Sequence, residues 1–275
     1  MKRAAILAVI AALPLMVRAG APPAVTNPYP DIAAAYAVTI DGRLAWASAP
    51  DLQRQPASLA KLLTALVLLG SPQWQPDVDV TVSAAAAAIE GSRVGLRQGD
   101  VLRAIDLLTG MLVRSGNDAC LALVEHAAGT MPAFAVRMNR HAAELGMRSS
   151  NFVHPCGLDA PGQYTTVADL LVLAGAARAE PRILQRAGAQ SGEIRTRAGR
   201  RLRFHNSNAL IGRDAQVTGL KSGFTSQAGN CVIALAEGDG HTVVLVLLGA
   251  KDRWWEATGM IARALGLASG RPRLD

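Results

Sequence analysis

The sequence lacks the signatures of several large classes of protein. Hydrophobic residues make up 50% and charged residues 18% of the 275 positions, which excludes a mainly disordered or fibrous chain. Cysteines number three, an odd count in a long chain, which argues against a disulfide scaffold. HExxH motifs, zinc-finger cysteine pairs, GxSxG elbows and phosphate-binding glycine loops are all missing, so we expect neither a metal nor another cofactor. Cys120, Cys156 and Cys231 are expected as buried thiols, and one disulfide pair among them stays open.

The first residues have the pattern of an export signal. A basic start, Met1-Lys2-Arg3, precedes the apolar residues 4–17, and small residues around Ala19 offer a cleavage point. A membrane anchor is the alternative, but the stretch is shorter than the roughly 20 residues of a spanning helix and contains Pro14. No cysteine lies in or just after it, so a lipid anchor has no candidate site. We therefore predict a signal peptide at residues 1–19 and export to the periplasm or the exterior of the cell envelope.

The chain is basic, with a formal charge of +7 and a pI near 9.9. Cleavage after residue 19 would remove Lys2, Arg3 and Arg18 and leave a charge of +4, which is 7 minus 3. This modest excess does not favour nucleic acid as a partner. Neither a linker nor an internal repeat interrupts residues 20–275, for which we predict a single domain.

Strand patterns occur at both ends of the chain and helical patterns between them. Residues 33–40 and 43–48 flank Asp41-Gly42, which is typical of a β-hairpin. Further strands are predicted at 217–221, 231–236 and 243–248. Helices are predicted at 58–69, 84–88, 101–113, 118–128, 132–145, 166–179 and 254–265. The order predicts an α+β fold in which both chain ends form one antiparallel sheet with flanking helices and a mid-chain helical subdomain.

A serine and a lysine one helical turn apart form the first candidate catalytic pair. Ser58-Leu59-Ala60-Lys61 opens the helix predicted at 58–69, which is apolar nearly all round and therefore buried. Burial disfavours the charged form of Lys61 and lowers its pKa, so that a neutral amine can accept the proton of Ser58. Because four of the 28 basic residues are lysine and the rest arginine, a functional lysine is favoured over a surface residue that extends its amine to solvent.

Two further triplets carry hydroxyl, amide and amine groups, although each means little alone. Ser115-Gly116-Asn117 lies between two predicted helices, where its polar side chains could simply cap the second one. Lys221-Ser222-Gly223 lies at a predicted strand, where a lysine is usually a solvated charge that discourages edge-to-edge aggregation.

Taken together and in this order, the three motifs resemble those of the penicillin-recognising serine enzymes. Further segments resemble low-molecular-mass D-alanyl-D-alanine carboxypeptidases, and the likeness extends from about residue 30 to residue 253. These segments are 90–96, 115–120, 157–159, 162–164 and 219–225. The resemblance implies the fold shared by serine β-lactamases and DD-peptidases.

The resemblance also implies roles in catalysis for three residues. Ser58 would be the acylated nucleophile, Lys61 its proton acceptor, and Ser115 the group that returns a proton to the leaving D-alanine. Water would then hydrolyse the acyl-enzyme. The implied reaction removes the terminal D-alanine from a peptidoglycan stem peptide, and penicillins would acylate the same serine as inhibitors.

Six more residues are implied to bind the substrate. Asn117 would hold the peptide backbone, while Lys221 and the Ser222 hydroxyl would bind the terminal carboxylate. The backbone N–H groups of Ser58 and Phe224 would form the oxyanion hole. Arg253 is a weaker candidate for the carboxylate, and a plain surface charge is its alternative. The binding set is therefore Asn117, Lys221, Ser222, Gly223, Phe224 and Arg253.

The chain departs from many relatives in two ways. Ser222 stands where most have threonine, which keeps the hydroxyl and loses a methyl group. The sequence ends at Asp275 without an all-β domain or an amphipathic anchor, so we expect a soluble protein. A run of arginines between 195 and 203 is expected to form a solvated hairpin face. Weak attraction to anionic wall polymers or lipid head groups is its less favoured alternative.

Three other functions compete with the carboxypeptidase. A DD-endopeptidase that cuts cross-links is the nearest, although such enzymes tend to have a different middle residue in the second motif. A class A β-lactamase would need a glutamate before the helix at Thr166, and none occurs between Asn151 and Tyr164. A catalytically silent wall-binding module is least favoured, because all the expected catalytic residues are present.

Overall fold

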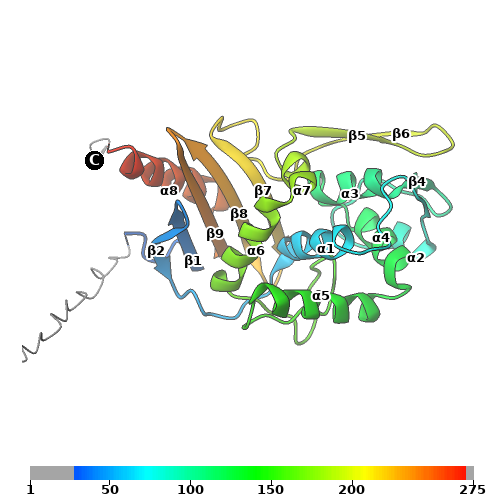
Figure 1. Cartoon of the computed structure of the whole chain (residues 1–275), viewed down its shortest axis with the longest axis horizontal. Helices are drawn as coiled ribbons and strands as arrows, with labels where there is room; N and C mark the ends of the chain where they lie inside the picture. The colour runs from blue at the N-terminus through cyan, green and yellow to red at the C-terminus, as the bar shows by residue number, and fades with distance from the viewer. Residues whose placement is uncertain (1–27, 271–275) are drawn as a thin grey trace, which may run out of the picture.

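The structure, a computed structural model, describes residues 28–270, so the predicted signal peptide lies outside the described residues. One antiparallel sheet of five strands organises the molecule, in the order β2-β1-β9-β8-β7 (Figure 1). The strands are β1 (Ala33–Ile40), β2 (Arg43–Ser48), β7 (Val217–Thr225), β8 (Gly229–Gly238) and β9 (His241–Ala250). β1 pairs with β9, with Tyr36 opposite Leu247. The prediction that both chain ends complete one sheet is therefore confirmed.

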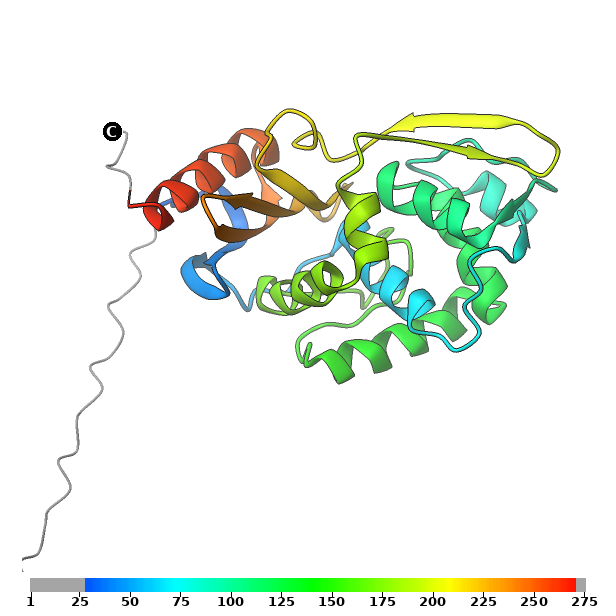
Figure 2. The ribbon, with the colours of Figure 1, turned by 45° about the horizontal axis from the view of Figure 1, so that its top comes forward.

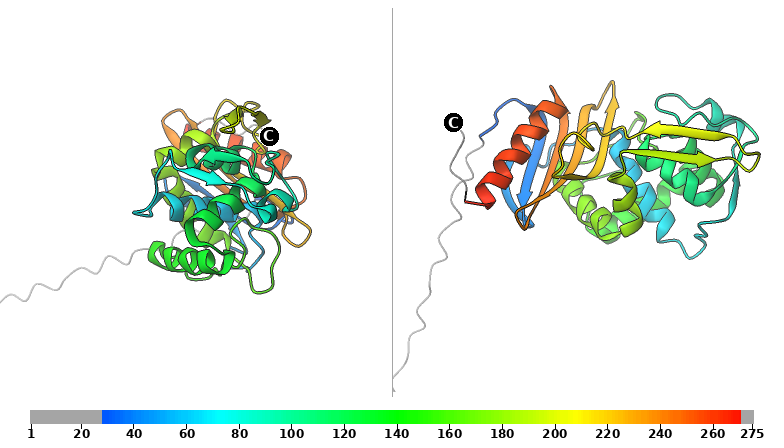
Figure 3. Two further views of the ribbon diagram at one scale, coloured as in Figure 1. Left: turned by 90° about the vertical axis from the view of Figure 1, so that its right-hand side faces the viewer. Right: turned by 90° about the horizontal axis from the view of Figure 1, so that it is seen from above.

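Helices cover both faces of this sheet. The closing helix α8 (Arg253–Ala268) packs on β8, β9 and β1 on one face, and its buried residues join a cluster with Tyr36, Trp46 and Leu247. On the other face, α6 (Val167–Ala179) contacts β1, β7 and β9. Figure 3 shows α8 and α6 on opposite sides of the strands. The sheet is thus buried on both faces, which explains the nearly continuous apolar runs of β8 and β9.

The middle of the chain forms a helical region beside the sheet (Figure 2). It contains α1 (Ala60–Leu69), α2 (Ala84–Ala88), α3 (Ala104–Val113), α4 (Asn117–Ala128), α5 (Met131–Leu145) and α7 (Pro181–Ala187). Two short strands, β3 (Asp79–Thr81) and β4 (Val101–Arg103), pair beside them. Within residues 28–270, no single helix is long and apolar enough to cross a membrane, and α4 with α5 meets that test only as a pair bent by 86°.

The structure corrects two predicted helices at their beginnings. Residues 101–113 were expected as one helix, but 101–103 form β4, because Val101 to Arg103 pair with β3 and Arg103 has an extended backbone. The helix expected from Ser58 begins instead as a 3₁₀ turn, η1 (Ala57–Leu59), and α1 follows it. Ser58 therefore lies in a tight turn at the entrance to α1.

A third correction concerns α7, which the sequence analysis did not predict. A proline at position 181 predicts the end of the preceding helix. In the structure Pro181 occupies the first turn of α7, where its missing N–H removes no hydrogen bond from the helix. The Glu180 side chain caps α7 by accepting from Arg182 N. The cap predicted at Thr166 is present, since its hydroxyl accepts from Asp169 N at 3.1 Å. The Asp169 carboxylate accepts instead from Arg148 N and Ser149 N.

The arginine run forms the expected hairpin, from β5 (Ser191–Arg195) and β6 (Arg201–His205). The hairpin extends along the helical region in Figure 1. Its charges are largely paired with carboxylates, namely Arg197 with Asp79, Arg200 with Asp100, and Arg201 and Arg203 with Glu193. These ion pairs leave less of the positive charge available to an anionic polymer than the sequence alone indicates.

Candidate active site

The first motif places a hydroxyl and an amine in direct contact. Ser58 lies in η1 and Lys61 in the first turn of α1, and Lys61 Nζ lies 2.8 Å from Ser58 Oγ. Lys61 Nζ also donates to the carbonyl oxygen of Cys156 at 2.5 Å. A neutral amine uses both contacts at once, because an N–H donates to the carbonyl while the nitrogen lone pair accepts from the serine hydroxyl.

The surroundings of Lys61 favour its neutral form. The side chain is fully buried, and this burial lowers its pKa well below the ordinary value of 10.5. The positive charge of Lys221 lowers the pKa further, while the carboxylate of Asp118 acts in the opposite direction. The sequence predicts that burial lowers the pKa of Lys61, and its surroundings in the structure lower that pKa in the same direction.

Two glycines allow the backbone at Ser58 to be enclosed on two sides. Ala57 has a φ of +49°, an uncommon conformation that turns the chain sharply before Ser58. A Cβ on Gly223 would lie 2.7 Å from Ser58 N, and a Cβ on Gly157 would overlap the carbonyl of Ala57. The lack of a side chain at Gly157 and Gly223 therefore lets the η1 turn pack directly against β7 and against the loop after Cys156.

The second motif lies between α3 and α4. Ser115 is buried and has a φ of +64°, and in the described chain its hydroxyl forms no hydrogen bond. Asn117 Nδ2 donates to Glu90 O at 2.7 Å, whereas its buried Oδ1 has no partner among the described residues. Gly116 stands at the N-cap of α4 and no side chain caps that helix. The alternative reading of Ser115 and Asn117 as helix caps is therefore wrong.

Asp118 fixes the loop that faces the second motif, a role that the sequence analysis missed. The side chain is fully buried, and its two carboxylate oxygens accept four backbone N–H groups at 2.9–3.0 Å. The donors are Val94, Gly95, Leu96 and Ala119. The acidic residue in the first turn of α4 was the available signal, but its partners come from a loop more than 20 residues away.

A disulfide joins the second motif to the loop that contacts Lys61. Cys120, on α4, is bonded to Cys156, while Cys231 is a buried free thiol. One of the pairings left open by the sequence is therefore present. Because the carbonyl of Cys156 accepts from Lys61 Nζ, the bridge connects the helix of Asn117 to the residue that holds the amine.

The third motif lies on β7, the edge strand next to η1. Lys221 is buried, and its Nζ donates to Ser222 O at 2.9 Å and to Ser207 Oγ at 3.4 Å. Burial, followed by the charge of Arg253, lowers the pKa of Lys221 to about 7. Ser222 Oγ donates to Ser207 O at 3.0 Å. The alternative of a solvated lysine at the sheet edge is therefore wrong.

Arg253 supports the third motif from the start of α8. Its Nη1 donates to Gly223 O at 2.7 Å and to Asn230 Oδ1 at 3.1 Å, and its guanidinium lies over the ring of Trp254. The plain surface charge that was its alternative is excluded by these contacts. Phe224 is 62% exposed and its side chain carries no hydrogen-bond donor, so its predicted contribution to an oxyanion hole stays with its backbone N–H. Edge strand β7 directs alternate N–H groups away from β8.

Metal ligation has no candidate in the described part of the chain. Within residues 28–270, no group of three or more His, Cys, Asp and Glu side chains is placed to hold a metal ion. The buried ionisable side chains of the three motif regions are instead Lys61, Lys221 and Asp118.

Comparison with solved structures identifies the class of fold. A Streptomyces DD-transpeptidase superposes with a TM-score of 0.81 and 24% sequence identity, covering 88% of this chain and 99% of that chain. A D-alanyl-D-alanine carboxypeptidase DacD from Francisella tularensis gives a TM-score of 0.75 at 24% identity, covering 84% of this chain and 70% of that chain. The fold is that of the DD-peptidases.

The sequence places the chain within that class. The family described as D-alanyl-D-alanine carboxypeptidase matches residues 23–252, and the chain belongs to this family. The carboxypeptidases DacD of Salmonella typhimurium and Escherichia coli are each 36% identical to it, over 73% and 80% of this chain and 53% and 59% of the relatives. A D-alanyl-D-alanine endopeptidase of Escherichia coli is 31% identical over 84% of this chain and 76% of that protein. The chain spans between half and three-fifths of the two carboxypeptidases' length.

Proposed function

We propose that this protein is a serine-type D-Ala-D-Ala carboxypeptidase that removes the terminal D-alanine from peptidoglycan stem peptides. The observation that carries the proposal is the contact of 2.8 Å between Ser58 Oγ and the fully buried amine of Lys61. A serine is a weak nucleophile until a neighbouring base accepts its proton. Family membership agrees with this chemistry.

The proposed reaction begins with attack of Ser58 Oγ on the carbonyl carbon between the two D-alanines. The hydroxyl proton passes to Lys61 Nζ, and the N–H groups of Ser58 and Phe224 stabilise the resulting oxyanion. The C–N bond then breaks as Ser115 delivers its proton to the nitrogen of the leaving D-alanine, and Lys61 passes the proton taken from Ser58 on to Ser115. Water then attacks the ester, one of its protons goes through Lys61 to Ser58 Oγ, and the shortened peptide leaves with the remaining hydroxyl as its new carboxyl group.

Binding of the terminal carboxylate is assigned to Lys221 and the Ser222 hydroxyl. An approaching carboxylate favours the charged form of Lys221, whose pKa is about 7 in the free protein. Arg253 is assigned a positioning role, since its Nη1 already donates to Gly223 O and Asn230 Oδ1. Asn117 is assigned to the peptide backbone, because its Oδ1 is buried and lacks a partner in the described chain.

Endopeptidase cleavage of cross-links is the second candidate, because one relative is named a D-alanyl-D-alanine endopeptidase. The middle residue of the second motif argues against it. A Cβ on Gly116 would lie 2.8 Å from Asp118 Oδ1 and 3.0 Å from Val94 Cγ1, so this site is built for glycine. A class A β-lactamase is disfavoured because no glutamate occurs between Asn151 and Tyr164, and Lys61 Nζ instead donates to the carbonyl oxygen of Cys156 in that segment.

Three assays separate these functions. Purified protein is incubated with a peptide ending in D-Ala-D-Ala, and free D-alanine is measured, with Ser58→Ala as the control. Release that depends on Ser58 is expected, and equal release by both proteins contradicts the proposal. Chromatography of digested cross-linked wall fragments detects endopeptidase cleavage instead. Benzylpenicillin should leave a long-lived adduct on Ser58, whereas rapid drug turnover indicates a β-lactamase.

Residues 1–19 are proposed as a signal peptide that directs the protein to the periplasm or the exterior of the cell envelope. The basic start and the short apolar stretch support this assignment. Amino-terminal sequencing of the protein from an envelope fraction tests it: a mature terminus near residue 20 is expected, and an intact Met1 on cytoplasmic protein contradicts it. Membrane or wall-polymer association is proposed to be weak at most.

A further inference from the structure

The loop of residues 90–96 is held in a fixed position beside the second motif. On one side, Asn117 Nδ2 donates to Glu90 O and Asn117 N donates to Ser92 O, both at 2.7 Å. Ser92 Oγ donates to Arg114 O at 2.9 Å. On the other side, the Asp118 carboxylate accepts the three consecutive N–H groups of residues 94–96. The backbone at Arg93 is therefore anchored from both directions.

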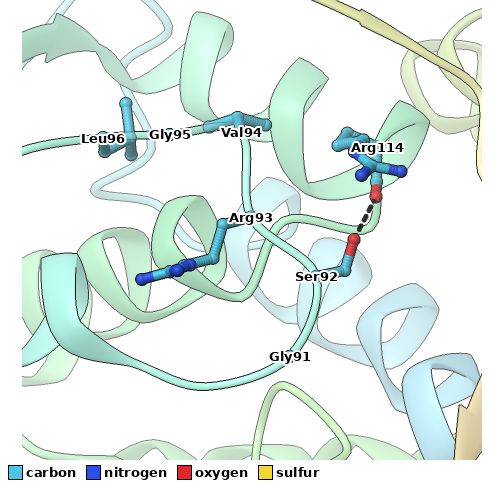
Figure 4. A pocket seen from close by; sticks show the side chains of 7 residues that line it. All are labelled: Gly91, Ser92, Arg93, Val94, Gly95, Leu96 and Arg114. Atoms are coloured by element: carbon cyan, nitrogen blue, oxygen red, sulfur yellow. Dashed lines mark hydrogen bonds between the residues drawn. The ribbon is translucent and has the colours of Figure 1, made fainter.

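A depression of about 510 Å³ lies along this loop, lined by Gly91, Ser92, Arg93, Val94, Gly95, Leu96 and Arg114. It adjoins the second motif, because Arg114 directly precedes Ser115 and the carbonyl oxygen of Ser92 accepts a hydrogen bond from Asn117 N. Figure 4 shows the side chains of Arg93 and Arg114 on either side of the loop. We call this feature, with its seven lining residues, the arginine depression.

Among the described residues, neither arginine of the arginine depression forms an ion pair with a carboxylate. Its lining contains two arginines and no carboxylate. Arg93 makes one long contact, 3.5 Å to Ala87 O, and the guanidinium of Arg114 has no partner among residues 28–270. The carboxylate of Asp118 is fully buried and occupied by four N–H groups. These two cations differ from the arginines of the hairpin, because four of the five between residues 195 and 203 are paired with carboxylates.

We propose that the arginine depression is a subsite for a carboxylate on the substrate peptide, at a residue preceding the two D-alanines. This inference rests on the proposed function, in which Asn117 holds the peptide backbone on the acyl side of the scissile bond. A peptide held there passes beside the loop that is bonded to Asn117. Guanidinium groups bind carboxylates through paired N–H donors. The protein therefore selects acidic stem peptides over peptides whose corresponding carboxylate is amidated.

Two synthetic peptides ending in D-Ala-D-Ala test the subsite. They differ only in a glutamate or a glutamine side chain at the residue before the D-alanines, and kcat/KM is measured from D-alanine release. We expect the acidic peptide to be preferred by about two- to fivefold at low salt, as for partly exposed ion pairs. The preference should shrink as salt is added, because exposed charges are screened.

The double variant Arg93→Gln with Arg114→Gln should bring the ratio of the two kcat/KM values close to one. A matched control changes the net charge equally at Arg43 and Arg213, two exposed arginines elsewhere on the surface, and should keep the preference. A wild-type ratio near one, or a preference lost equally in the control, overturns the subsite. An equal loss in both variants would indicate long-range charge in place of a local site.

A binding measurement separates this inference from the proposed function. Calorimetric titration of the Ser58→Ala protein with each peptide requires no turnover, so it reports the subsite even if wild-type protein releases no D-alanine. Tighter binding of the acidic peptide, abolished by the two arginine substitutions, supports the subsite. Equal affinity for both peptides overturns it, whereas absent D-alanine release with intact selective binding contradicts only the proposed function.

Discussion

The helical region and the sheet region build their halves of the site by different means. On the helical side, Lys61 and Asn117 depend on contacts between loops and helices, namely the Cys156 carbonyl, the Glu90 carbonyl and the disulfide to α4. On the sheet side, Lys221 lies on a strand whose pairing with β8 sets its position, opposite Ile233. The side that is assigned proton transfer is thus held by long-range connections, and the side assigned carboxylate binding by strand register.

The two regions each contain one buried lysine, and the two lysines differ in pKa and in their hydrogen-bond partners. Burial lowers the pKa of both, but Lys61 is shifted well below 10.5 while Lys221 reaches about 7. Lys61 lies against a hydroxyl that can give it a proton, whereas Lys221 has only a carbonyl and a hydroxyl until a carboxylate arrives. In the proposed mechanism, the same burial serves a base in one region and an anion-binding group in the other.

Removing the base should have the largest effect. Lys61→Met keeps the length and apolar packing of the side chain but not the amine, so we expect acylation by benzylpenicillin to slow by about 10²- to 10⁴-fold. Stability should be unchanged or higher, because a buried amine is replaced by a hydrophobic group. Stopped-flow acylation and thermal unfolding measure the two effects, with exposed Lys251→Met as the control. An acylation rate near that of the wild type would show that Lys61 is not the base.

The pH dependence of KM should reveal the second lysine. Lys221 binds a carboxylate only while charged, and the charged fraction falls as the pH rises through about 7. We therefore expect KM for a D-Ala-D-Ala peptide to increase above that pH, toward the roughly 10- to 100-fold expected for loss of a charged hydrogen bond. The rise should level off at the higher pKa that Lys221 has beside a bound carboxylate. Lys221→Arg should flatten the profile over about two pH units above 7, because arginine stays charged there. An unchanged profile contradicts the assignment.

The contact between the two regions can be tested at Gly223. A Cβ there would lie 2.7 Å from Ser58 N and 2.8 Å from Ala57 Cβ, so Gly223→Ala must push the η1 turn away from β7. We expect acylation to fall by about tenfold, with a stability loss of about 1–3 kcal/mol from overpacking. Gly259→Ala is the matched control, since nothing lies within 4 Å of its Cβ position on α8. Full activity of Gly223→Ala would mean that the close approach is not needed.

The cross-link on the helical side should matter more for stability than for rate. Replacing Cys120 and Cys156 by alanine opens a loop of 36 residues, which corresponds to about 3–4 kcal/mol of unfolding free energy. Acylation should slow only severalfold, because the Cys156 carbonyl loses one of its supports while Lys61 stays buried. Chemical denaturation and acylation rates of the double variant check this, and Cys231→Ala preserves the bridge. Unchanged stability would show that the bridge does not form in the protein.

Much of the fold was predictable because its signals are local. The Asp41-Gly42 turn, the Thr166 cap and the apolar periods of α4 and α5 are each contained within a few residues, and the structure has all of them. Three-residue strands such as β3 and β4 carry too short a pattern to detect. α7 was missed because Pro181 is compatible with both a helix end and a helix beginning.

The candidate site was predictable in its residue types but not in its connections. The spacing of Ser58 and Lys61 alone indicated that they share a helical face, and the structure joins them. The Cys120–Cys156 bridge, the Cys156 carbonyl and the carboxylate of Asp118 connect residues 22 to 95 positions apart. No periodicity or spacing encodes such pairs, because tertiary packing decides which loops meet.

The central claim, an uncharged amine at Lys61 that accepts the proton of Ser58, is tested most directly by the pH dependence of acylation. The second-order rate constant for benzylpenicillin is measured by intact mass for the wild type and Lys61→Met. We predict a rate that rises with pH through an ionisation well below 10.5, the ordinary pKa of lysine, and a residual rate in the variant without this ionisation. A rate that still climbs as the pH approaches 10.5, or an identical profile in Lys61→Met, would contradict the account.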